Sequence, residues 1–196
     1  MASTSLSDYV TAGVLALLCA GLALPASAEV LQAGGVYSAG TTLEAPQYGV
    51  AFTLPEGWIG ALPPGSALVL MKAERKDVEA YIYAGIERMT LEQARSMMQG
   101  DLDAEGDVVF HPRGELRAEG STLSGEYSVT GSENVTEGWV RTLLSEQGWA
   151  VSFLAHSSPD HVEILQRALD AICRSVELSE PAEDGASTRE APPGGD

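Results

Sequence analysis

The sequence predicts an α+β fold, in which an antiparallel β-sheet is flanked by two main helices. Several short segments alternate apolar and polar residues and are joined by short turns. This indicates antiparallel neighbours, because parallel strands need long crossovers. Two other segments carry apolar residues at helical spacing and must bury those stripes on a sheet. The expected order is strands, helix, strands, helix, in a single domain over about residues 46–178.

The first half of this domain predicts three strands. Residues 48–54 alternate strictly between apolar and small or polar side chains, as in a strand with one buried face, and Pro55-Glu56-Gly57 then turns the chain. Residues 66–73 and 78–86 are further apolar runs of strand length. The charged segment 74–77 joins them, so the pair predicts a β-hairpin.

The first helix is predicted to begin at Thr90. Thr90 and Gln93 have the spacing of a capping box, in which each side chain binds the backbone N–H of the other residue. Gly106 is a candidate stop. The expected apolar stripe consists of Leu91, Ala94, Met97, Met98 and Leu102.

Residues 107–156 return to strand patterning. Val108 and Phe110 belong to a first strand, and residues 115–118 and 121–130 to two more. The clearest hairpin joins residues 138–144 to residues 148–156 through a polar turn.

The last helix has strong start signals. Ser158 is a natural N-cap, Pro159 suits the first helical position, and Asp160 complements the positive end of the helix dipole. The following apolar residues fall at helical spacing and predict a buried stripe. They are Val162, Leu165, Leu169, Ile172 and Val176, with Ile164 and Ala168 widening the stripe.

Residues 1–28 predict an export signal. The apolar run from Val10 to Leu24 is about 15 residues long, whereas a membrane-spanning helix needs roughly 20. Pro25 ends the run, and the small residues of Ala26-Ser27-Ala28 suit a signal peptidase, so cleavage is expected before Glu29. No Lys or Arg precedes the apolar run, which leaves an uncleaved N-terminal anchor as the alternative. Cleavage would leave no stable membrane insertion and a periplasmic or secreted protein.

The cysteines bear on both export and folding. Leu18 precedes Cys19, whereas lipoprotein processing prefers a small residue there, so Cys19 is interpreted as an apolar part of the signal. Cys173 is then the single cysteine of the mature chain and has no partner for an internal disulfide. Core burial is expected for Cys173; an exposed thiol would instead allow an intermolecular disulfide.

Charge and composition limit the partners. The formal net charge is −17, and the sequence contains no cluster of Lys and Arg. Both observations argue against nucleic acid and anionic membranes as partners. Residues 179–196 lack large apolar side chains and are rich in Pro, Gly and acids, so they predict a disordered acidic tail. Residues 29–45 are weakly patterned and are interpreted as a lead-in to the domain.

Two segments resemble a known family. YGVAFTLPEGW (48–58) resembles the opening of PsbP/Mog1-like (DcrB-like) domains, and SSPDHVEILQRALDAICRSVEL (157–178) looks like their C-terminal helix. The resemblance covers roughly residues 46–178 and implies a central antiparallel sheet flanked by helices. It implies no catalytic residues. Bacterial members are often exported proteins of unassigned role, and plant members assist photosystem assembly.

The histidines are His111, His156 and His161. A metal site or a Ser158-containing acid/base set can be drawn from His156, Asp160 and His161. However, zinc needs three or four convergent ligands and this spacing is no recognised motif. The motifs of serine hydrolases, zinc proteases and phosphate-binding loops are absent from the sequence, so the prediction is no enzyme, no cofactor and no metal.

Tryptophans are the remaining candidates for a ligand site. Trp58, Trp139 and Trp149 are interpreted first as core residues, and an apolar ligand pocket lined by Trp58 or Trp149 is the alternative. The leading functional hypothesis is an exported, non-enzymatic protein that binds an envelope protein or a larger assembly. A small apolar-ligand-binding protein is second, and the oligomeric state stays open.

Overall fold

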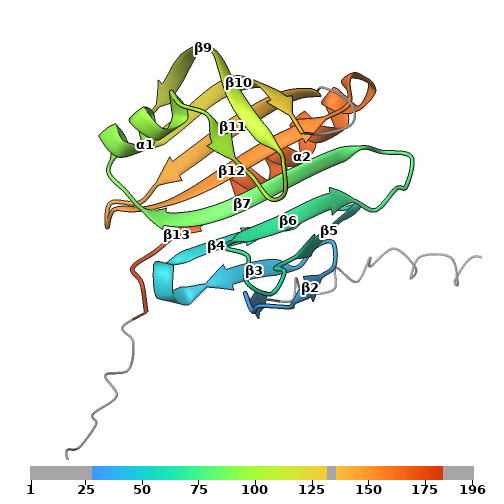
Figure 1. Ribbon diagram of the computed structural model, residues 1–196. Coiled ribbons are helices and arrows are strands. Elements are labelled where there is room, and N and C mark those ends of the chain that lie inside the picture. The colour runs from blue at the N-terminus through green and yellow to red at the C-terminus, as the bar shows by residue number, and fades with distance from the viewer. Residues whose placement is uncertain (1–27, 132–135, 183–196) are drawn as a thin grey trace, which may run out of the picture.

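The computed structural model describes residues 28–131 and 136–182 and contains two β-sheets and two α-helices (Figure 1). The larger sheet has the strand order β2-β5-β6-β7-β12-β11-β10-β9-β8, and all its neighbours are antiparallel. Its strands are β2 (Val36–Tyr37), β5 (Trp58–Ala61), β6 (Leu68–Ala73), β7 (Ala80–Arg88), β8 (Leu102–Asp103), β9 (Val109–Glu119), β10 (Thr122–Thr130), β11 (Thr136–Leu144) and β12 (Trp149–Ser157).

The smaller sheet has the order β1-β3-β4-β13, and its β1–β3 pair is parallel. Its strands are β1 (Ala28–Val30), β3 (Thr42–Ala45), β4 (Val50–Thr53) and β13 (Glu177–Leu178). The helices are α1 (Leu91–Met98) and α2 (Val162–Ser175), with short 3₁₀ turns η1 (Pro46–Tyr48) and η2 (Pro159–His161). The predicted α+β class, with mostly antiparallel strands and two helices, is therefore confirmed.

The two helices lie on opposite faces of the larger sheet, as the alternating side chains of β12 show. Phe153 belongs to the same buried cluster as Leu169 of α2 and Phe52 of the smaller sheet. Its neighbour Leu154 belongs to a second cluster that contains Met98 of α1. Successive side chains of a strand point to opposite faces, so one sheet separates two apolar cores.

Strand β9 contains an irregularity that shapes the far end of the larger sheet. Arg117 pairs with Ser124, but the next regular pair is Arg113 with Glu126, so residues 114–116 lie opposite Gly125 alone. Gly114 in this bulge has a φ of 77°, a conformation that side chains disfavour. A Cβ at Gly125 would lie 2.7 Å from Leu116 Cδ2, so a larger residue there would require the Leu116 side chain to move.

The capping box at the first helix is confirmed. Thr90 Oγ1 accepts a hydrogen bond from Gln93 N at 3.2 Å, and Gln93 Oε1 accepts one from Thr90 N at 2.8 Å. The helix is shorter than predicted, because it ends at Met98 instead of near Gly106. Leu102 lies in β8 and is buried there through pairing with β9.

The start predicted for the second helix is wrong by several residues. Pro159 to His161 form the 3₁₀ turn, and α2 itself begins at Val162. The Ser158 side chain makes no capping bond and binds the His161 ring instead. The separate strands predicted at Val108 and Phe110 and over 115–118 are largely one strand, β9, which the bulge interrupts.

The described structure extends on both sides of residues 46–178. Residues 29–45, expected to be a lead-in, contain most of β1 and all of β2 and β3, and Leu43 is fully buried. Ser179 N donates to Gly49 O at 2.8 Å and Ala182 N to Pro46 O at 2.8 Å. The predicted signal residues 1–27 and most of the predicted disordered tail, residues 183–196, lie outside the described residues.

Candidate functional site

A groove lies beside α2, where the helix leaves part of the larger sheet uncovered. Helix α2 packs on β7 and β12 and reaches only the near side of β11. Beyond it, a hollow of about 400 Å³ opens over β9, β10 and β11. We call this hollow the arginine groove, after the side chains that dominate its lining: Arg113, Arg117, Glu126, Trp139, Arg141 and Asp170.

Strand register brings these side chains together as two rows on one face of the sheet. Arg117, Ser124 and Arg141 are direct cross-strand neighbours on β9, β10 and β11. The second row is Arg113, Glu126 and Trp139, formed in the same way. Cross-strand neighbours point to the same face. Arg141 and Trp139 pair with Phe153 and Ala155, which belong to the cluster under α2, so both rows face the α2 side.

Two ion pairs hold the groove in shape. Arg141 Nη1 lies 2.5 Å from Asp170 Oδ1, with 30% and 42% of the two side chains exposed, and this pair joins β11 to α2. Arg117 Nη2 lies 3.5 Å from Glu126 Oε1, with side-chain exposures of 83% and 62%. Pairs this exposed contribute about 0–1 kcal/mol each, so their main effect is to orient the side chains.

Arg113 is the arginine of the groove whose side chain is available to a ligand. Within residues 28–131 and 136–182, its guanidinium forms no ion pair and no side-chain hydrogen bond. The side chain is exposed at the bulge of β9. An anionic group on a ligand therefore finds one arginine that needs no rearrangement before binding.

A second hollow of about 420 Å³ continues from the groove around the bulge. It shares Arg113, Gly114, Glu115 and Glu126 with the arginine groove and reaches the end of α1. Arg95 on α1 lines it and, across the described parts of the chain, also lacks an ion pair. We call this hollow the α1 pocket. The two hollows together form a curved path over the bulge.

Cys173 lies near this region on α2 and is partly buried. Burial raises the pKa of its thiol, and the neighbouring Arg141 guanidinium partly opposes that change. The thiol is therefore protonated at neutral pH and is a poor nucleophile.

The residues proposed for an apolar pocket do not line the arginine groove. Trp58 is buried in the core with 3% of its surface exposed. Trp149 is partly buried at the start of β12, where its ring centroid lies 4.6 Å from that of Tyr48. Trp139 is the tryptophan that lines the groove. An apolar pocket at Trp58 or Trp149 stays a prediction.

The predicted cleavage site adjoins the first strand. Ala28 and Glu29 are exposed residues of β1 and pair with Thr42 and Leu43 of β3. Ala26 lies outside the described residues. The cleavage itself stays a prediction. Across residues 28–131 and 136–182, no helix is long and apolar enough to cross a membrane.

His156 is a core residue. It is 3% exposed, and its ring lies between aromatic neighbours, with centroids 5.3 Å from Tyr81 and 5.8 Å from both Tyr83 and Phe110. The Tyr83 hydroxyl lies 3.4 Å from His156 Nε2. Burial disfavours the charged imidazolium and lowers the pKa of His156 to about 4, so the ring is neutral at pH 7.

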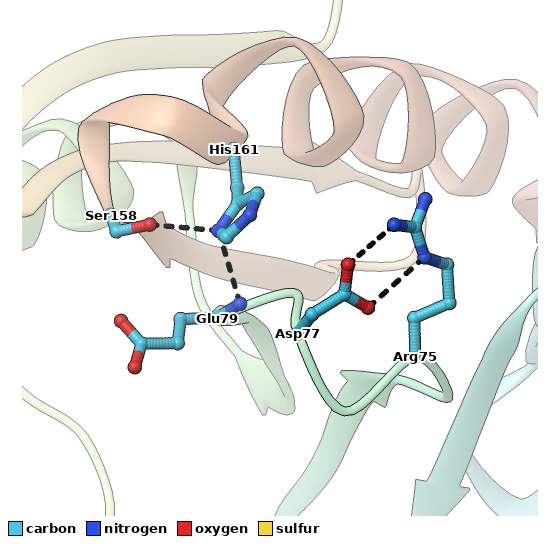
Figure 2. Close-up of polar contacts among 5 residues, drawn as sticks. All are labelled: Arg75, Asp77, Glu79, Ser158 and His161. Atoms are coloured by element: carbon cyan, nitrogen blue, oxygen red, sulfur yellow. Dashed lines mark hydrogen bonds and ion pairs between the residues drawn. The ribbon is translucent and has the colours of Figure 1, made fainter.

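His161 joins two segments that are far apart in the sequence (Figure 2). Its Nδ1 accepts hydrogen bonds from the Glu79 backbone N–H at 3.1 Å and from the Ser158 hydroxyl at 2.8 Å. The exposed Arg75–Asp77 pair, at 2.6 Å, lies beside this junction. An N–H can only donate, so Nδ1 is unprotonated, and the bond holds the start of α2 against the segment leading into β7.

The histidines thus bind different neighbours. His111 Nδ1 contacts Asp101 at 2.9 Å and its Nε2 contacts Thr130 Oγ1 at 2.9 Å. Among the residues that the structure describes, no group of three or more His, Cys, Asp or Glu side chains has an arrangement suited to a metal ion. Of the acid/base set drawn from Ser158, His156, Asp160 and His161, the structure shows the contact between Ser158 Oγ and His161 Nδ1.

The arginine groove was not predicted from the sequence. The polar face of residues 121–130 was visible as the alternation of Ser124, Glu126 and Ser128. A single polar face is common to solvent-facing strands, so this pattern alone did not indicate a site. Recognising one required the register that places Arg117 and Arg141 on either side of Ser124.

By fold, the chain is a mixed α+β protein of mostly antiparallel strands. It matches no family model and no curated protein. Its structure is similar to the solution structure of cyanobacterial PsbP (CyanoP) from Synechocystis sp. PCC 6803, with a TM-score of 0.47 and 18% identity, covering 76% of this chain and 94% of that chain. Membership in the PsbP/Mog1-like family stays a prediction.

Proposed function

We propose that this protein is an exported, non-enzymatic binding protein that holds a partner protein of the cell envelope in the arginine groove. The apolar segment and the small residues before Glu29 support the export part of this proposal. The observation that carries the binding proposal is the uncovered sheet face, where two rows of charged side chains and Trp139 lie open beside α2.

The composition of this surface supports a protein partner. Tryptophan and arginine are among the residues most enriched where proteins bind one another tightly. The groove combines one partly buried tryptophan with three arginines, in a chain that has 11 basic residues in total. Because charged side chains make up half of the residues that line the hollow, it is a poor fit for the small apolar ligand of the alternative hypothesis.

The proposal is tested by site-specific photocrosslinking in the exporting cells. A photoreactive phenylalanine analogue replaces Ser124 on the groove floor, and in a matched control it replaces the exposed Ala67 in the turn before β6. We expect a discrete crosslinked product from position 124 and none from position 67. The product from position 124 is expected to disappear in the R113E/R117E background.

Two results would count against the proposal. Equal crosslinking from both positions would mean that contacts are non-specific. A product from position 124 that persists unchanged in R113E/R117E would mean that the groove charges do not select the partner. Both arginine side chains are exposed, so loss of folding is not expected to confuse the readout, and circular dichroism of the variant checks this.

A further inference from the structure

The arginine groove and the α1 pocket contain more cationic than anionic side chains. Arg95, Arg113, Arg117 and Arg141 line the two hollows, against the three carboxylates of Glu115, Glu126 and Asp170. This local excess stands out in a chain whose formal net charge is −17. The side chains of the two hollows therefore favour a negatively charged ligand at short range, although the acidic protein as a whole repels such a ligand at long range.

Only some of these charges are available to a ligand. Arg141 is paired with Asp170 and Arg117 with Glu126. Arg95 and Arg113 have no ion pair with any described residue, and both line the α1 pocket. Each guanidinium group can bind a carboxylate through two parallel N–H donors, so two unpaired guanidinium groups beside one hollow suit a carboxylate ligand.

The shape indicates an extended ligand. The arginine groove and the α1 pocket have volumes of about 400 and 420 Å³, and they share the bulge residues. A single carboxylate fills only a small part of either hollow. A chain that runs from Trp139, over the bulge, to Arg95 would contact both.

The edge of the sheet is closed to a simple added strand. Strand β8 pairs only with Val109 and Phe110, which leaves the rest of β9 at the edge. That edge carries Pro112, the bulge at Gly114, and charged side chains, all of which oppose pairing with another strand. An extended ligand is therefore expected to cross this edge over the bulge without pairing as a strand, from the arginine groove on the α2 face to the α1 pocket on the α1 face.

We infer that the arginine groove and the α1 pocket recognise an extended acidic segment of the partner protein, with a carboxylate of that segment held between Arg95 and Arg113. This inference rests on the proposed function, and it names the chemistry of the partner. Glu115 lies between the two hollows and repels a continuous polyanion, so the segment has spaced carboxylates separated by neutral residues.

The test measures fluorescence anisotropy of a labelled peptide of alternating Glu and Ala against the full exported chain. The matched probes are the same peptide with Gln or with Lys in place of Glu. The test variant is R95E/R113E. The control variant K72E/R88E has the same change in net charge at exposed positions that line neither hollow.

We expect the Glu peptide to bind and the Gln and Lys peptides to bind at least about tenfold more weakly. We expect R95E/R113E to weaken the Glu peptide by at least about tenfold and K72E/R88E by no more than about twofold. Equal binding of the Glu and Gln peptides would overturn the inference. Equal losses in both variants would also overturn it, because net charge alone would then explain the effect.

The failures of the two proposals are distinguishable. Crosslinking from position 124 without binding of the Glu peptide would refute the acidic segment as the ligand and would still support a partner protein in the groove. The opposite outcome is binding of the Glu peptide that depends on Arg95 and Arg113, with no crosslinked partner. It would support recognition of an anionic peptide and refute the envelope partner.

Discussion

The buried His156 makes the stability of the fold depend on pH in a defined window. The pKa of the ring is about 4 in the folded protein, against the ordinary value of 6.5 in the unfolded chain. As the pH falls below 6.5, the unfolded chain takes up a proton on this residue and the folded protein does not. Protonation therefore favours unfolding, and stability is lost as the pH falls from about 6.5 to about 4.

The size of this effect follows from the same two values. One pKa unit corresponds to about 1.4 kcal/mol, so the lowered pKa of His156 makes the free energy of unfolding smaller by about 3 kcal/mol at pH 4 than at pH 7. This is a large part of the 5–15 kcal/mol typical of a folded domain. The 3% exposure of the side chain means that solvent screening reduces the effect little.

The assay compares urea unfolding of the wild type and H156Q at several pH values between 7 and 4. Glutamine keeps a neutral polar side chain near Tyr83 and does not titrate. The many carboxylates titrate in both proteins, so their contribution cancels in the difference. We expect H156Q to gain about 3 kcal/mol relative to the wild type as the pH falls. A difference that stays constant across this range would refute the reasoning, as would an equal gain in the matched variant H111Q, whose ring is partly exposed.

Three further predictions follow from single side chains. T90A is expected to lose about 1 kcal/mol of unfolding free energy through loss of the capping box, whereas S158A, which removes no capping bond, should lose less; chemical denaturation compares them, and equal losses would contradict the assigned roles. L169A removes a fully buried side chain from the cluster under α2 and is expected to cost about 2–5 kcal/mol; a loss below about 1 kcal/mol would mean that α2 is not packed as described. Cys173 is expected to react with a thiol reagent much more slowly in the native protein than after denaturation, because burial raises its pKa; equal rates would contradict its partial burial.

Local signals predicted the elements that depend on nearby residues. The capping box at Thr90 and Gln93 placed the start of the first helix correctly, because both hydrogen bonds join residues three positions apart. The hairpin of β11 and β12 was equally visible, since its turn and its alternating strands are contiguous. In both cases the stabilising contacts lie within a short stretch of chain.

Predictions failed where a distant segment determines the local structure. Ser158 has the features of an N-cap, but the His161 ring accepts its hydroxyl and also binds Glu79, which moves the start of α2 to Val162. Leu102 continues the helical spacing, yet pairing with Phe110 makes it part of a strand. Propensity is a weak preference that such tertiary contacts override.

The acidic character, the α+β class and the position of most elements follow from the sequence by itself, because they depend on composition and on the spacing of near neighbours. Which strands become neighbours is decided by the tertiary structure, because the pairing of β7 with β12 joins distant segments and depends on burial of both sheet faces. The arginine groove belongs to this second class. Arg113, Glu126 and Trp139 meet only when three strands pair in one register, and a shift of one residue in β10 would turn Glu126 to the opposite face.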